Sequence, residues 1–171
     1  MSRLPMTALI AALALAGCAG EGPPAEQPSF YRSMASPTAE LDAAAAASMI
    51  SGYRQNNGLG VVTVDPTLMQ LAQAQASAMA ARDKVDSDAK GAFAKRMQAS
   101  GFDAKASVEN ISAGYHTLAE AFSGWRDSPP HRANMLKDGV TRIGIAAVYT
   151  PNSKYKVFWA LILAAPPDKK G

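Results

Sequence analysis

The chain has 171 residues, of which 48% are hydrophobic and 18% are charged. This composition is typical of a single globular domain and excludes a long disordered protein or an array of domains. The formal charge is only +3, and the basic residues are scattered, so the sequence gives no indication of nucleic-acid binding. The single cysteine, Cys18, excludes an internal disulfide, and a body of about 130 residues can fold without one.

The first eighteen residues have the pattern of an export signal that ends at a cysteine. Arg3 provides a positive start, residues 4–16 carry no charge, and small residues precede Cys18. The apolar run has about thirteen residues, whereas a bilayer span needs about twenty, so it predicts a signal peptide over residues 1–17. The sequence Leu15-Ala16-Gly17-Cys18 resembles the lipobox of bacterial lipoproteins. This resemblance implies that the thiol of Cys18 is lipidated and that Cys18 becomes the new N-terminus.

The residues after Cys18 bear on location and on domain boundaries. In lipoproteins an aspartate directly after the cysteine tends to retain the protein in the inner membrane, and here Ala19 stands there. The resemblance therefore implies an exported outer-membrane lipoprotein that faces the periplasm or the cell surface. Residues 18–38 are rich in Gly, Pro, Glu, Gln and Ser, which predicts a tether. We expect the folded domain over residues 39–166 and a flexible tail over 167–171.

Three helices are predicted in the first part of the domain. A helix over about 39–56 follows from apolar residues that recur every four positions, namely Leu41, Ala45, Met49 and Tyr53. After a short extended piece at 61–64, Asp65 can cap and Pro66 can start a second helix that reaches about Arg82. A short third helix is expected near 92–99, ending at Gly101.

The second part of the domain combines one more helix with strands. Thr117 and Glu120 have the spacing of a capping box for a helix that the sequence Ser128-Pro129-Pro130 must end. Residues 143–149 and 155–163 are rich in β-branched and aromatic side chains, with a turn between them, which predicts a β-hairpin. Helices followed by strands indicate an α+β sandwich with an antiparallel sheet. Trp125 and Trp159 are expected in the core, because both lie among aliphatic neighbours.

In this order, residues 41–165 resemble the CAP superfamily, also called the SCP or pathogenesis-related-1 domain. The resemblance is carried by five short motifs in the expected order: Tyr53-Arg54 with Gly58-Leu59 and the helix from Asp65; Glu109-Asn110-Ile111 with Gly114-Tyr115; Trp125, Ser128 and Pro129; His131 to Leu136; and Ile143-Gly144-Ile145 with Phe158-Trp159. It implies an α-β-α sandwich with a central antiparallel sheet.

The resemblance also implies a cleft that holds two histidines and one or two acidic residues, in some members with a divalent cation. Glu109 and His131 are the residues at matching motif positions, and they are the candidates for binding zinc or magnesium. Ser87 stands where the family has its first histidine, so a metal site would need Asp88 as a further ligand. With Asn110 and Asn134, these residues complete the predicted cleft, in which the two asparagines are expected to tie loops rather than react.

Alternative interpretations of the same residues remain open. Glu109 and His131 could form a buried hydrogen-bonded pair that only holds the fold, or a group that transfers a proton. Ser87, His131 and Glu109 could form a nucleophilic triad, but no Gly-rich elbow frames Ser87, and its acidic neighbours would repel an oxyanion. Arg132 is expected to form an ion pair, and His116, just before the capping threonine, is expected to be exposed.

Three functions follow as hypotheses. The first is a non-enzymatic, lipid-anchored envelope module that binds a small apolar ligand or a protein partner, as the resemblance implies for some relatives. It needs no cofactor. The second is a metal-assisted hydrolase that uses Glu109 and His131 on peptides or envelope polymers. The third is a purely structural envelope module. The missing family histidine favours the first hypothesis, so catalysis is not expected.

Overall fold

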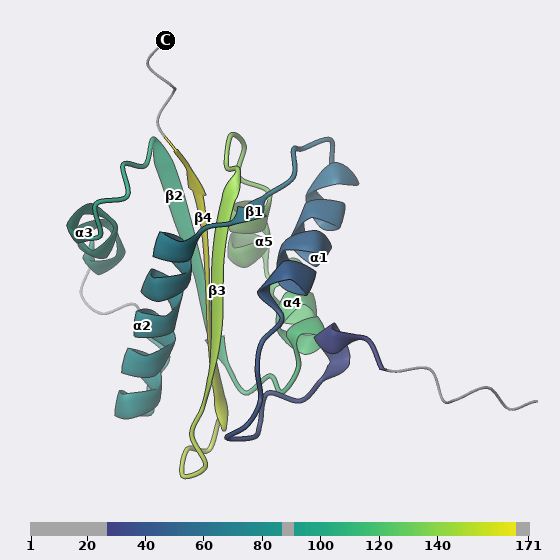
Figure 1. Cartoon of the computed structure of the whole chain (residues 1–171), viewed down its shortest axis with the longest axis vertical. Coiled ribbons are helices and arrows are strands. Elements are labelled where there is room, and N and C mark those ends of the chain that lie inside the picture. Colours follow the sequence, from purple (N-terminus) through teal and green to yellow (C-terminus); the bar gives the residue numbers. More distant parts are fainter. Residues whose placement is uncertain (1–26, 87–90, 167–171) are drawn as a thin grey trace, which may run out of the picture.

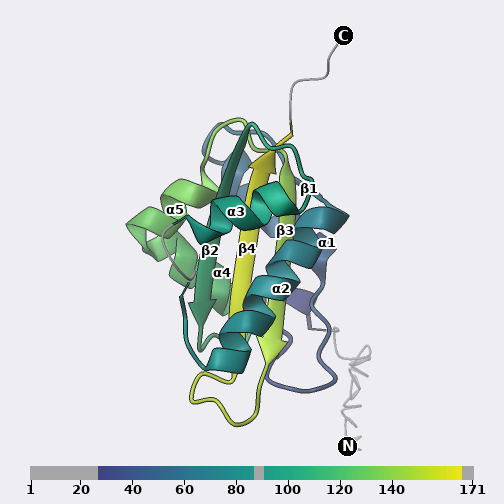
Figure 2. The same ribbon diagram turned by 90° about the vertical axis from the view of Figure 1, so that its left-hand side faces the viewer.

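A computed structural model describes residues 27–86 and 91–166 and shows three layers, with a sheet between two groups of helices (Figure 1). Helices α2 and α3 cover one face of the sheet, and α1, α4 and α5 cover the other (Figures 1 and 2). The elements are η1 (Ser29–Tyr31), α1 (Ala43–Gln55), β1 (Thr63–Val64), α2 (Pro66–Arg82), α3 (Ala92–Ala99), β2 (Ala106–Ala113), α4 (Leu118–Asp127), α5 (Pro129–Met135), β3 (Arg142–Tyr149) and β4 (Val157–Ala165). The predicted α-β-α sandwich is confirmed.

The sheet has the strand order β1-β3-β4-β2. Strand β4 pairs antiparallel with both β2 and β3, which confirms the predicted antiparallel sheet and its closing hairpin. The two-residue strand β1 adds a parallel pair at the edge beside β3, so the sheet as a whole is mixed. A crossover through α2 and the following elements separates β1 from β3, and such long connections are what parallel pairing requires.

The helix boundaries follow from local capping. The Asp65 side chain accepts hydrogen bonds from the backbone N–H groups of Thr67 and Leu68 (2.9 and 3.1 Å), and Pro66 is the first residue of α2. The capping box of Thr117 and Glu120 is present at the start of α4. The prolines that end α4 also begin α5, because proline is tolerated in a first helical turn.

Apolar side chains fill the space on both faces of the sheet. Every residue of β4 is buried, and both tryptophans are completely buried, with their rings in edge-to-face contact at 6.4 Å. The approach of α2 to the sheet is close at Gly144, where an added Cβ atom would overlap the backbone of Leu68. A side chain at this position would therefore push α2 away from β3.

The buried face of α1 is offset from the one that the sequence predicted. The predicted positions, including Met49 and Tyr53, are only partly buried, and the fully buried residues include Ile50 and Arg54. The rotation brings the Arg54 side chain, which is 1% exposed, into the interior. This position of a cation was not predicted from the apolar periodicity.

The guanidinium of Arg54 joins distant segments through backbone carbonyls. It donates hydrogen bonds to the carbonyl oxygens of Gly60 (2.9 Å), Met135 (2.9 Å), Lys137 (2.8 Å) and Val140 (3.2 Å). Burial lowers the pKa of Arg54, and the negative charge of Asp138 acts in the opposite direction. Arg54 therefore fixes the chain after α1 and the loop after α5 to one another.

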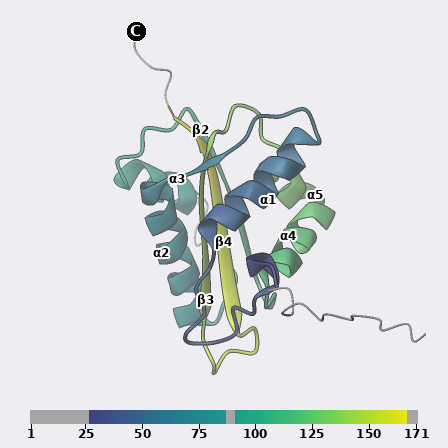
Figure 3. The same ribbon diagram turned by 45° about the vertical axis from the view of Figure 1, so that its right-hand side comes forward.

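The part of the predicted tether that the structure describes, residues 27–38, packs against the domain (Figure 3). Met34 is 4% exposed, and its backbone N–H donates a 2.6 Å hydrogen bond to the carbonyl of His116. The side chain of Ser29 donates to Asp42, the residue that caps α1. Within the described residues, packing against the domain therefore begins before residue 39, because Met34 lies in the core and Phe30 and Ala35 contact it.

Candidate functional site

Four of the predicted cleft residues lie on two neighbouring elements, β2 and α5. Glu109 and Asn110 are consecutive residues of β2, and His131 and Asn134 lie one helical turn apart on α5. Ser87 and Asp88, the other two predicted cleft residues, lie outside the described residues. The structure therefore describes the positions of these four residues but not those of the other two.

The two asparagines join β2 to α5. The side-chain amide of Asn110, a residue that is 1% exposed, donates a 3.0 Å hydrogen bond to the carbonyl of His131. The amide of Asn134 donates to the carbonyl of Glu109 (3.0 Å) and to the side-chain oxygen of Asn110 (2.9 Å). The His131 and Glu109 backbones are thus close together, and the asparagines tie chain segments as the sequence suggested.

The carboxylate of Glu109 points toward α3. Successive side chains of a strand alternate between the two faces of a sheet, so Glu109 faces α3 whereas Asn110 faces α5. Nη2 of Arg96 on α3 lies 2.8 and 3.0 Å from the two carboxylate oxygens of Glu109. Both partners are largely buried, with 22% of the Arg96 side chain and 6% of the Glu109 side chain exposed. Among the described residues Glu109 thus forms an ion pair with Arg96. The side-chain hydrogen bond between Glu109 and His131 that one interpretation of the sequence expected is not found among these residues.

Arg96 is a residue that the sequence analysis did not identify. Its guanidinium also lies over the ring of Phe93, 5.7 Å from the centroid, which holds it near the surface of α3. The three-residue spacing of Phe93 and Arg96 on one helix was a local signal for this contact. The ion pair to β2 had no local signal, because thirteen residues separate its partners.

His131 is partly buried at the start of α5, and desolvation lowers the pKa of its imidazole from the usual 6.5. The ring is therefore neutral at pH 7, the form that can accept a proton or bind a metal ion. His116 is exposed, as expected, and its backbone N–H donates to the carboxylate of Glu120.

The described residues do not by themselves fit a metal site. Within residues 27–86 and 91–166, no group of three or more His, Cys, Asp and Glu side chains lies close enough to hold an ion. The guanidinium of Arg96 further disfavours a cation at the Glu109 carboxylate, because two positive charges would compete for the same oxygens. The ion pair that the sequence suggested for Arg132 is not among the salt bridges of these residues.

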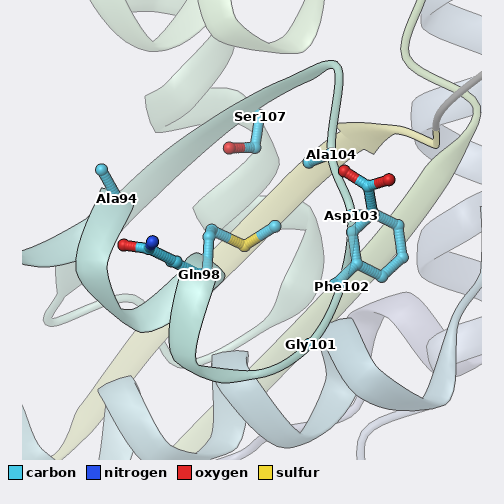
Figure 4. Close-up of a pocket in the computed structure, with 8 residues that line it drawn as sticks. Ala94, Gln98, Gly101, Phe102, Asp103, Ala104 and Ser107 are labelled. Carbon is cyan, nitrogen blue, oxygen red and sulfur yellow. The ribbon is translucent and has the colours of Figure 1, made fainter.

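A cavity of about 480 Å³ lies between α3, the loop that follows it and the start of β2 (Figure 4). Met97 and Phe102 supply apolar walls, and Gln98, Asp103 and Ser107 supply polar groups. Ser107 and Glu109 are two residues apart on β2 and therefore lie on the same face of the sheet. The cavity has the size and the mixed lining of a site for a small ligand.

The comparisons with known structures concern the fold. An outer surface protein of Borrelia burgdorferi superposes with a TM-score of 0.66 at 17% identity, over 73% of this chain and 92% of that one. An extracellular SCP-domain protein of Bacillus anthracis gives a TM-score of 0.61 at 20% identity, over 71% of this chain and 39% of that one. In the described part of this chain, no helix combines the length and apolar character that crossing a bilayer requires.

A sequence relative gives a nearer match over a shorter region. The uncharacterized protein YkwD of Bacillus subtilis is 31% identical over 102 residues, which are 58% of this chain and 40% of YkwD. The chain thus matches less than half of that relative. Residues 47–163 also match the sequence pattern of the cysteine-rich secretory protein family. This match covers all five motifs and nearly the complete sheet, so the chain belongs to the CAP, or cysteine-rich secretory protein, family.

Proposed function

We propose that this CAP-family protein is exported, anchored through lipid on Cys18 in the outer membrane, and acts by binding a small apolar ligand or a protein partner without catalysis. The single observation that carries the proposal is the ion pair of Arg96 and Glu109. It engages the one acidic residue that the family motif places in the cleft. A carboxylate held by a guanidinium on both oxygens is a weak base and a weak cation ligand.

The ligand site in this proposal is the cavity between α3 and β2. Met97 and Phe102 offer apolar contacts to a hydrocarbon group, and Ser107 and Gln98 offer hydrogen bonds to a single polar head. A compact amphipathic lipid or sterol has both features. Most of the lining comes from the short helix α3 and the loop after it, so small movements of α3 relative to β2 would adjust the cavity to its ligand.

A thermal-shift screen with envelope lipid extract and with sterols tests this site. Ala94→Trp places a large side chain in the cavity lining, and Lys95→Trp, the next residue and also exposed, is the matched control outside it. We expect lipid to raise the Tm of the wild type and of Lys95→Trp but not of Ala94→Trp, since binding to the native state stabilises it. If no lipid, sterol or envelope extract shifts the wild-type Tm, ligand binding is refuted.

The anchor is tested separately. Mass spectrometry of protein purified from its own membranes should find a chain that begins at an acylated Cys18, and Cys18→Ser should appear unacylated in the soluble fraction. A wild-type chain that begins at Met1 without acyl groups would refute the anchoring.

The second candidate is a metal-assisted hydrolase, and the neutral imidazole of His131 favours it. Titration with zinc and with magnesium decides between the candidates. The binding proposal expects no saturable site in the wild type. Saturable binding that His131→Ala abolishes, together with hydrolysis of a peptide or an envelope polymer, would establish the hydrolase instead.

The purely structural hypothesis makes a different prediction for Glu109. Glu109→Ala should cost about 1–3 kcal/mol, because the buried guanidinium of Arg96 loses a partner. If Glu109→Ala lowers stability but leaves ligand and partner binding to the folded protein intact in every assay, the ion pair only stabilises the fold.

A further inference from the structure

We infer that the face formed by η1, the start of α1 and the start of α4 rests on the membrane surface, so that the cavity under α3 faces away from the bilayer. The inference rests on the proposed anchoring at Cys18. The residues that form this face, called the η1 face below, are Pro28, Phe30, Tyr31, Ala45, Ser48, Met49, Thr117 and Ala119.

The length of the linker sets the distance. Eight residues separate Cys18 from Gln27, where the described chain begins. Even fully extended, they allow about 30 Å between the lipidated residue and the domain, because one residue spans at most about 3.6 Å. The chain enters the domain at η1, so the η1 face is the part of the domain held nearest to the bilayer (Figure 3).

The chemistry of the η1 face suits the interface of a membrane. Tyr31 is 51% exposed, the largest exposed fraction among the large hydrophobic side chains of the described residues. Its ring lies 4.7 Å from that of Phe30, which packs against the core. Tyrosine is favoured at the level of lipid headgroups, where its ring is buried and its hydroxyl stays hydrated. The neighbouring hollow between η1 and α1 adds Met49 and Ala45 to the apolar surface.

The charges on this face indicate which lipid surface it fits. Arg32 is exposed, but Glu40, Asp42 and Glu120 lie on the same segments, so the face is not basic. Two of these carboxylates are engaged in caps, Asp42 at α1 and Glu120 at α4. Attraction to anionic lipids therefore does not contribute, and the face fits a zwitterionic surface that the short linker keeps at high effective concentration.

The proposed ligand cavity lies on the opposite side of the sheet from the η1 face. Helix α3 lies across the sheet from α1 and η1 (Figures 1 and 2). With the η1 face on the bilayer, the cavity between α3 and β2 opens toward the aqueous side, where a ligand or partner can reach it. The orientation would thus separate the anchoring face from the binding face.

Spin labelling of the full lipid-anchored protein in phosphatidylethanolamine–phosphatidylcholine vesicles tests the orientation. An acylated Cys18 does not react, so a single introduced cysteine carries the label: Ser48→Cys on the η1 face or Gln98→Cys on α3, both at exposed positions. We expect the Ser48→Cys label to gain accessibility to oxygen and lose accessibility to a polar nickel complex, by at least about twofold relative to the Gln98→Cys label. Adding salt or phosphatidylglycerol should not increase this contrast.

The role of the aromatic residue is tested by substitution in the same labelled protein. Tyr31→Ser should abolish most of the contrast, whereas Val61→Ser, which removes a similarly exposed apolar side chain outside this face, should leave it unchanged. Equal accessibility at both labels, with Cys18 shown by mass spectrometry to be acylated, would refute the orientation and leave the anchoring intact. An unacylated Cys18 would refute both.

Discussion

Replacing the buried cation Arg54 tests what holds the chain after α1 against the loop after α5. Arg54→Met keeps a long apolar side chain in the interior but leaves four backbone carbonyls without their donor. Hydrogen bonds to a charged group contribute about 1.5–3 kcal/mol each, which gives about 6–12 kcal/mol for four. Dehydration of the guanidinium costs several kcal/mol, so the expected net loss is about 3–5 kcal/mol.

This loss is measurable by urea denaturation and by thermal unfolding. With the m-value of a small domain, the urea midpoint should fall by about 2 M, and the Tm should fall by about 10–20 °C. Gln55→Met is the matched control, because Gln55 is the next residue of α1 and is exposed. Arg54→Lys should recover only part of the stability, since an ammonium group cannot reach all four carbonyls. A loss below about 1 kcal/mol for Arg54→Met, the size of a surface ion pair, would refute this reasoning.

Three further predictions concern the sheet, the candidate cleft and pH. Gly144→Ala should lower the free energy of unfolding by about 3 kcal/mol or more, because the new Cβ atom overlaps the α2 backbone. Gly52→Ala, which has open space around it, should raise the free energy of unfolding by about 0.5–1 kcal/mol. Equal effects of the two substitutions in urea unfolding would contradict the close approach of α2 to β3. Asn134→Ala should lower the free energy of unfolding by about 1–3 kcal/mol, since the Glu109 carbonyl and the Asn110 side-chain oxygen lose their donor. An unchanged free energy of unfolding would show that water replaces the Asn134 amide. Burial lowers the pKa of His131 in the folded state below its unfolded value of 6.5, so the unfolded state binds more protons and stability falls as the pH drops below 6.5. Measured from pH 7 to 5, the free energy of unfolding should therefore decline less in His131→Gln than in the wild type. His116→Gln, at an exposed position, should decline as the wild type does. If His131→Gln declines as steeply as the wild type, other groups cause the loss of stability.

Features fixed by neighbouring residues were predictable from the sequence. The Asp65 cap and the capping box at Thr117 act within three residues, so their patterns predicted the starts of α2 and α4. The apolar composition of Val157–Ala165 predicted a strand, and its burial on both faces matches its central position in the sheet.

Features that depend on distant segments were not predictable in this way. The parallel pairing of β1 with β3 joins residues that lie almost eighty positions apart. Arg54 lies on a helix whose apolar spacing indicated another buried face, and only the folded chain supplies its carbonyl partners. For the candidate cleft, family motifs identified Glu109 and His131, but the direction of the Glu109 carboxylate depends on α3, which carries Arg96. A local pattern does not contain that information.

The central position of β4 has a consequence for how the protein is made. Both β2 and β3 hydrogen bond to β4 rather than to each other, and β4 is the last of the four strands of this sheet in sequence order. Until Val157–Ala165 emerges, the two earlier strands have no common neighbour and their apolar faces have no complete sheet on which to pack. Folding of this sheet should therefore wait until Val157–Ala165 has been synthesised, and a nascent chain stalled before Val157 should remain sensitive to protease and dependent on a chaperone.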